Sequence, residues 1–267
     1  QKAFIIIIDT HCHLDNKQYY EDIDTVIENA LNHGVKGFLI PGADFNDLPQ
    51  AIKLAEKYEE VYFAVGIHPY DIDMYNEEIM EKYVNHPKCI AIGECGLDYF
   101  RLPEDEDEKI ANVEKQKEVF ISQIEFAKKV KKPLIIHIRE ASNDSRQILI
   151  DYNAKEVGGV LHCYNASEHL LPLSEHNFYF GIGGALTFKN AKKLVEVLPK
   201  IPKDKLLIET DAPYLTPHPH RGERNEPYYT TFVAQKMAEL LELSQEDIED
   251  LTTNNAKKLF KEFSSLS

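Results

Sequence analysis

The 267-residue sequence lacks the features of several common protein classes. Its four cysteines form no Cys-x-x-Cys pair and lie scattered in apolar segments, which is typical of free buried thiols in a reducing compartment rather than of a disulfide framework. No apolar run approaches the ~20 residues that a membrane-spanning helix needs. The apolar run 4–8 is shorter than the core of a signal peptide. We therefore expect a cytoplasmic protein without membrane contact, and no segment indicates an obligate protein partner.

Positive charge is also scarce. The chain has 30 lysines and arginines against 45 aspartates and glutamates, which gives a formal net charge of -15. Contacts to phosphate need clustered lysine and arginine, so this balance argues against a broad surface that coats nucleic acid. Any chemistry on nucleic acid must therefore be local to one site.

Short apolar, β-branched segments recur eight times along the chain and predict buried strands. These segments are 4–9, 35–40, 61–67, 89–94, 133–138, 159–163, 178–182 and 206–209. Between them lie segments with helical periodicity, such as Ile23, Val26, Ile27, Ala30 and Leu31. No proline-, glycine- or serine-rich linker interrupts the series.

Strands that alternate with helices predict repeated βα units and a parallel sheet. Eight units in this length fit a (β/α)8 TIM barrel, which we expect to form one domain over 1–267. A doubly wound open sheet alternates in the same way and stays an alternative at this point. Two further segments, 101–112 and 216–227, are predicted as loops, the first because the acidic run 104–108 should be solvated or mobile.

Ionisable residues gather at the C-terminal ends of the predicted strands, and a barrel brings those ends to one mouth. A single His-x-His pair occurs often by chance, but burying the whole set is costly unless metals or hydrogen bonds compensate. Four imidazoles with two carboxylates exceed the ligands of one tetrahedral ion, which favours two ions bridged by a carboxylate. The set comprises His11, His13, His68, Glu94, His137, His162, Glu209 and Asp211.

The same residues carry a resemblance to the TatD family of metal-dependent deoxyribonucleases, nearly from end to end. It is carried by His11-Cys12-His13-Leu14-Asp15, Gly66-Ile67-His68-Pro69, Gly93-Glu94-Cys95-Gly96-Leu97-Asp98-Tyr99, Ile136-His137-Ile138-Arg139, Leu161-His162-Cys163, Glu209-Thr210-Asp211-Ala212-Pro213-Tyr214-Leu215 and Arg221-Gly222-Glu223-Arg224-Asn225-Glu226-Pro227. The resemblance implies a (β/α)8 barrel in which Glu94 bridges two metal ions. The implied ligands are His11, His13, Glu94, His137, His162 and Asp211. One departure is visible: Tyr164-Asn165-Ala166 stands where the family usually has Phe-Ser-Gly.

We expect a two-metal hydrolase of phosphodiesters, a deoxyribonuclease with exonuclease-like action on DNA ends or single strands. The divalent cations would be Zn2+, Mn2+ or Mg2+, and Asp211 would be the general base that accepts a proton from the attacking water. An alternative is a C–N or ester hydrolase of a small molecule on the same barrel, although many such enzymes bridge their metals with a modified lysine where this chain has Glu94. Another alternative is a non-catalytic metal-binding barrel.

Residues around the expected metals receive supporting roles. Arg139, Arg221 and Arg224 are predicted to hold phosphate oxygens, and His68 to contact substrate. Glu209 is predicted to orient a metal ligand or to pair with Arg139. Cys12, Cys95 and Cys163 adjoin proposed ligands, but strand alternation should send them to the opposite face for packing.

Overall fold

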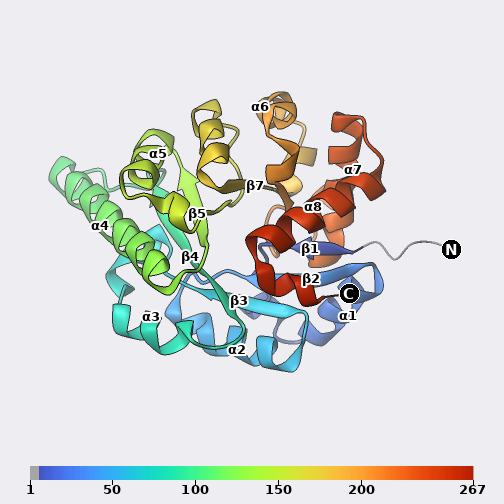
Figure 1. Ribbon diagram of the computed structural model, residues 1–267, viewed down its shortest axis with the longest axis horizontal. Coiled ribbons are helices and arrows are strands. Elements are labelled where there is room, and N and C mark those ends of the chain that lie inside the picture. The colour runs from blue at the N-terminus through green and yellow to red at the C-terminus, as the bar shows by residue number, and fades with distance from the viewer. Residues whose placement is uncertain (1–5, 267) are drawn as a thin grey trace.

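Residues 6–266 are described by the computed structural model (Figure 1), and their eight strands form one parallel sheet in the order β1 to β8. The strands are β1 (Ile7–Asp9), β2 (Val35–Ile40), β3 (Val61–Val65), β4 (Cys89–Asp98), β5 (Leu134–Arg139), β6 (Gly159–Leu161), β7 (Phe178–Ile182) and β8 (Leu206–Ile208). The helices are α1 (Ile23–Asn32), α2 (Leu48–Lys57), α3 (Glu77–Val84), α4 (Glu106–Val130), α5 (Ser142–Asp151), α6 (Lys192–Val197), α7 (Thr230–Leu241) and α8 (Gln245–Leu259). All eight predicted strands are present, except that positions 4 and 5 of the first lie outside the described residues.

The two ends of the sheet meet, which makes it a nearly closed barrel. Each strand pairs in parallel with the next one along the chain. Beyond the ends of β8 and β1, the backbone N–H of Thr10 donates to the carbonyl of Ile208 at 3.2 Å, and that of Asp211 donates to the carbonyl of His11 at 2.9 Å. Sequential strand order with joined ends confirms the (β/α)8 barrel and excludes the doubly wound open sheet.

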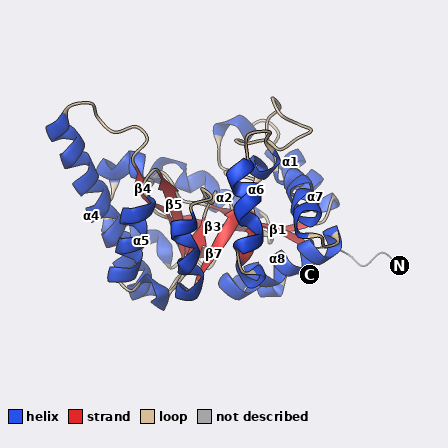
Figure 2. Ribbon diagram, turned by 90° about the horizontal axis from the view of Figure 1, so that it is seen from above, coloured by secondary structure: helices blue, strands red, loops and turns tan. Residues whose placement is uncertain are grey.

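Alternating side chains divide the core into an inner and an outer layer. Leu39, Ile135, Val160 and Leu207 belong to the cluster inside the barrel. Their neighbours along each strand pack outward against the ring of helices that encloses the strands in Figure 2. Because side chains alternate with period two, residues two positions beyond these inner residues point into the barrel mouth.

The opposite end of the barrel is covered by the segment that follows α8. Phe260 and Phe263, which follow α8, are fully buried in the inner cluster, and Phe263 lies edge-on to Tyr62 on β3 at 5.1 Å between ring centroids. Solvent therefore reaches the interior from the C-terminal mouth, where the ionisable residues lie. Among the helices of residues 6–266, none is long and apolar enough to cross a membrane.

The acidic run corrects one prediction. The sequence predicts a loop over 101–112, but α4 begins at Glu106 and includes the second half of this segment. The Asp105 side chain caps this helix by accepting a hydrogen bond from the N–H of Glu108 at 3.0 Å. Carboxylates in a first turn face the positive end of the helix dipole, so the acids that repel one another in an extended chain stabilise the start of a helix.

Candidate metal centre

Two histidines follow β1 and converge, although the strand does not continue through them. Strand β1 ends at Asp9, whose carboxylate accepts a hydrogen bond from the N–H of His11 at 3.2 Å. A bend at Thr10 shifts the alternation, so that His11 and His13 face the mouth with ring centroids 5.1 Å apart. Cys12 and Cys95 pack in the outer core layer, away from the mouth, as predicted, whereas Cys163 is among the residues that line the cavity at the mouth.

The Glu94 carboxylate lies at the centre of the mouth, with its side chain 4% exposed. Its Oε2 atom lies 3.3 Å from Nε2 of His11. Its Oε1 atom lies 3.1 Å from Nδ1 of His137 and 3.4 Å from Nε2 of His162. The two oxygens of one carboxylate therefore face different imidazoles, Oε2 that of His11 and Oε1 those of His137 and His162.

Asp211 completes the group on the Oε2 side. Its Oδ1 atom lies 3.1 Å from Nε2 of His13 and 3.4 Å from Nε2 of His11. Two ligand atoms on one tetrahedral ion lie roughly 3.4 Å apart, so these spacings suit a shared cation. The buried ring nitrogens of His11 have no hydrogen-bond partner among the described residues. An unpartnered buried nitrogen among carboxylates fits a metal ligand, and the donor set as a whole fits one or two divalent cations.

Two buried carboxylates orient the imidazoles of β5 and β6. Asp98 Oδ2 lies 2.8 Å from Nε2 of His137, and Glu209 Oε2 lies 2.7 Å from Nδ1 of His162. A carboxylate behind an imidazole fixes its orientation and leaves the other nitrogen for a metal. Glycine is needed at position 181, because a Cβ there would clash with the Glu209 carboxylate.

The role of Glu209 was predicted from the sequence, whereas that of Asp98 was not. Glu209 contacts His162 as one of its two predicted roles requires, but no ion pair joins it to Arg139 among the described residues. Asp98 received no role, although it lies on β4 in the same phase as Glu94, four positions further on. That shared phase is the signal that could have found it.

The charges of the site favour bound cations. Burial raises the pKa of Glu94, but the attraction of His162 and His11 outweighs it and holds this pKa well below its ordinary value. Burial lowers the pKa of His162 and His13, yet the surrounding carboxylates dominate and raise these two pKa values to about 10 and about 9. Divalent cations would replace these protons, so metal binding should strengthen as pH rises.

His68 lies at the edge of this cluster. Its Nδ1 accepts a hydrogen bond from the N–H of Tyr70 at 3.0 Å, and its Nε2 lies 3.8 Å from Glu94 Oε1. Burial lowers the pKa of His68 to about 4, which makes it a neutral imidazole at neutral pH. It can therefore contact a substrate or an ion on the Oε1 side of Glu94.

The three predicted phosphate-binding arginines are not brought together. Arg139, at the end of β5, stacks on the Phe100 ring at 3.7 Å and lines the cavity beside Asp211. Arg221 stacks on the Phe188 ring at 3.9 Å and lies outside that lining. Arg224 makes a two-pronged ion pair with Asp22 at 2.6 and 3.0 Å, which gives it a structural partner at the start of α1 and does not support a phosphate contact.

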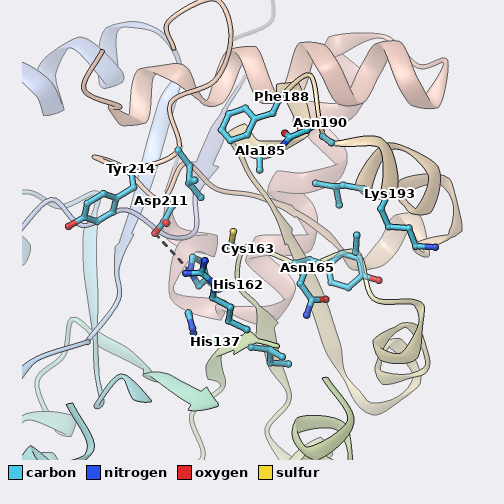
Figure 3. A pocket seen from close by; sticks show the side chains of 17 residues that line it. His137, His162, Cys163, Asn165, Ala185, Phe188, Asn190, Lys193, Asp211 and Tyr214 are labelled. Carbon is cyan, nitrogen blue, oxygen red and sulfur yellow. Dashed lines mark ion pairs between the residues drawn. The ribbon is translucent and has the colours of Figure 1, made fainter. Parts of the chain in front are cut away.

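An eight-stranded barrel whose mouth gathers imidazoles around a shared carboxylate defines the class of metal-dependent hydrolases. Figure 3 shows His137, His162 and Asp211 converging on one wall of the open cavity. Within this class the chain belongs to the TatD family. The family model described as TatD related DNase matches residues 8–261.

Relatives along the whole chain agree with this assignment. The chain is 45% identical over 262 residues to the uncharacterized metal-dependent hydrolase YabD of Bacillus subtilis, across 96% of this chain and 99% of that one. It is 32% identical over 265 residues to the 3'-5' ssDNA/RNA exonuclease TatD of Salmonella typhimurium, with the same shares covered. The crystal structure of the TatD homologue YJJV from Escherichia coli superposes with a TM-score of 0.88 at 27% identity, across 97% of this chain and 99% of that one.

Proposed function

We propose that this metal-dependent hydrolase cleaves phosphodiester bonds of DNA, trimming ends or single strands in the manner of an exonuclease. The observation that carries the proposal is the Glu94 carboxylate, whose Oε2 faces His11 while its Oε1 faces His137 and His162. Such a carboxylate suits two ions a few ångströms apart, the arrangement used for in-line displacement at phosphorus. The Salmonella relative named as an exonuclease supports the same chemistry.

Six side chains would hold the cations. His11, His13 and Asp211 would bind on the Oε2 side of Glu94, and His137 and His162 on the Oε1 side. When bound, the cations lower the pKa of water and polarise the phosphoryl oxygens. Zn2+, Mn2+ and Mg2+ are all compatible with this mixture of imidazole and carboxylate.

Asp211 is the proposed general base. Burial raises its pKa, but the attraction of His162 and the hydrogen bond from His13 outweigh burial and lower it, so the carboxylate stays ionised at neutral pH. Asp211 also borders the open cavity, where an attacking water would lie next to its carboxylate. Arg139 borders the same cavity and would place a phosphate oxygen through paired N–H donors.

The test uses metal-depleted protein reconstituted with single ions. Labelled single-stranded DNA, duplex DNA and bis(p-nitrophenyl) phosphate, a generic diester, serve as substrates. We expect cleavage of all three, fastest on single strands and at ends. Hydrolysis of amides or carboxylic esters without any diester cleavage would refute the proposal in favour of a small-molecule hydrolase.

The variant Asp211→Asn tests whether Asp211 acts as the general base or only supports the fold and the metals. Because general-base catalysis contributes ~10²- to 10⁴-fold, kcat should fall by that factor while the fold and much of the metal remain. Asp250→Asn, an exposed aspartate on α8, is the matched control and should keep full activity. Activity of the Asp211 variant within a few-fold of the parent would move the base elsewhere, with Glu209 and His68 as the next candidates.

A further inference from the structure

A cavity of about 580 Å³ opens beside the proposed metal centre. Its wall on the metal side contains His137, His162 and Asp211. Its far wall, built by the segment between β7 and α6, by α6 itself and by the segment after β8, is largely apolar and includes Phe188, Leu194 and Leu215. This volume lies within the range of small-molecule sites, about 300–1,000 Å³.

Phe188 is held in place from outside the cavity. The guanidinium of Arg221 covers its ring at 3.9 Å, and Arg221 itself is fixed by donating a hydrogen bond to the carbonyl of Thr216 at 3.1 Å. Arg221 is not among the lining residues, whereas Phe188 is. Figure 3 shows Phe188, Ala185 and Asn190 grouped across the cavity from His137. A fixed aromatic ring thus lies on the wall opposite the proposed metals.

The polar side chains of the cavity suit an anionic ligand that carries amide-like edges. Asp211 is the one carboxylate among the lining residues, in a chain with a net charge of -15, and Arg139 adds positive charge. Lys193 also lines the cavity, but its Nζ is ion-paired with Glu168 at 3.1 Å. The Asn165 amide is fixed: its Nδ2 donates to Ser142 Oγ at 3.0 Å and its Oδ1 accepts from the N–H of Ser167 at 3.0 Å. One N–H and one lone pair of this amide remain for a ligand.

The loop after His162 has a residue with left-handed backbone at the cavity edge. Ala166, where the family usually has glycine, has a φ of 67°, a left-handed conformation that favours glycine. The Ala166 methyl group and the Asn165 amide both belong to the cavity wall.

We propose that this cavity is a subsite for the nucleobase of the nucleotide whose phosphate lies at the metal centre, with Phe188 as the stacking surface. The inference rests on the proposed function, because it assumes a nucleotide substrate. Base-on-aromatic stacking tolerates every base and typically strengthens binding by about 5- to 150-fold. The Asn165 amide would add a hydrogen bond to the base edge.

A pair of ligands that differ only in the base tests the subsite. Calorimetry on Mn2+-loaded protein compares dAMP with 2-deoxyribose 5-phosphate, which has the same sugar and phosphate without the base. We expect dAMP to bind at least about 5-fold more tightly. Phe188→Leu, which keeps an apolar side chain under Arg221 but removes the ring, should bring the ratio close to one. Tyr152→Leu changes an exposed aromatic outside the cavity and should leave the ratio unchanged.

The outcomes separate this inference from the proposed function. Equal affinities of the parent protein for the two ligands, or no binding of dAMP, would overturn the subsite whatever the protein cleaves. A Phe188 variant that weakens both ligands equally would also overturn it, because the ring would then act only on the fold. A preference for dAMP that depends on Phe188, in a protein that cleaves no diester, would uphold the subsite and refute the nuclease proposal.

Discussion

Glu94 is the residue on which the two proposed metals depend together. One carboxylate contacts imidazoles of His11, His137 and His162 within 3.4 Å. Glu94→Ala should therefore remove both ions, whereas His11→Ala should weaken mainly the ion on the Oε2 side. Metal counting by mass spectrometry on purified variants measures this, with Glu239→Ala on the exposed face of α7 as control. Two ions retained by the Glu94 variant would refute the bridging role.

Individual site residues were predictable from sequence where strand alternation alone decides their direction. His137, His162 and Glu209 each lie two positions beyond an inner core residue, so their approach to the mouth follows from period two. The directions of the arginine side chains were not predictable, because a long side chain can reach any of several partners that only the tertiary structure brings near it. Arg224, for example, forms an ion pair with Asp22, which lies some two hundred positions earlier in the chain.

Element types were easier to predict than element ends. All eight strands were anticipated, but β4 runs to Asp98 rather than stopping at Glu94, because β5 offers it backbone partners as far as Arg139. The first strand ends at Asp9 as predicted, and the Asp9 carboxylate there accepts hydrogen bonds from the N–H groups of His11 and Thr210. Such ends depend on contacts with other parts of the barrel, which no local pattern encodes.

The start of α4 depends on its cap. Asp105→Ala removes the side-chain acceptor for the N–H of Glu108, and loss of an N-cap costs about 1 kcal/mol, so the free energy of unfolding should fall by about that amount. Urea denaturation measures the change. Glu104→Ala, one position earlier and equally exposed, is the control and should change stability much less. Equal stability of the two variants would mean that the cap hydrogen bond contributes nothing.

Helix α8 carries a buried acid that makes stability depend on pH. Burial raises the pKa of Glu249 above its ordinary value of 4.5; a hydrogen bond from Gln245 opposes this, and repulsion from Asp250 and Glu246 adds to it. As pH rises above 4.5, Glu249 loses its proton in the unfolded chain but keeps it in the folded chain. The free energy of unfolding therefore falls with rising pH until the pH exceeds the raised pKa of Glu249 in the folded state.

Glu249→Gln removes this titration. Its stability relative to the parent protein should therefore increase from pH 4 toward pH 7, which urea denaturation of metal-free protein at several pH values can follow. Glu239→Gln, the same substitution at an exposed position on α7, is the control. A difference for Glu249→Gln that falls or stays constant over this range would contradict the raised pKa.

The net charge of the whole molecule has the same sign as that of a polyanionic substrate. Its net charge of -15 repels DNA, and the exposed acids 104–108 follow β4 on the side of the barrel mouth. Within the cavity beside the proposed metals, however, Asp211 is the one carboxylate and Arg139 supplies a positive charge, whereas Lys193 is ion-paired with Glu168. Attraction must therefore come from the cations and a few side chains in the mouth, which hold a strand end or a short single strand better than a length of duplex.

Salt dependence measures how many phosphates such a site engages. With roughly two or three phosphates bound, the slope of log affinity against log salt should be about -2 or shallower. A titration of single-stranded DNA binding, or of kcat/KM at fixed free metal, gives this slope. Replacing acids 104–108 by glutamine should raise affinity at low salt and change it little at high salt, where screening shortens their reach. A slope of about -6 or steeper would require an extended phosphate track, which the separated Arg139, Arg221 and Arg224 do not form, and end trimming would then have to be abandoned.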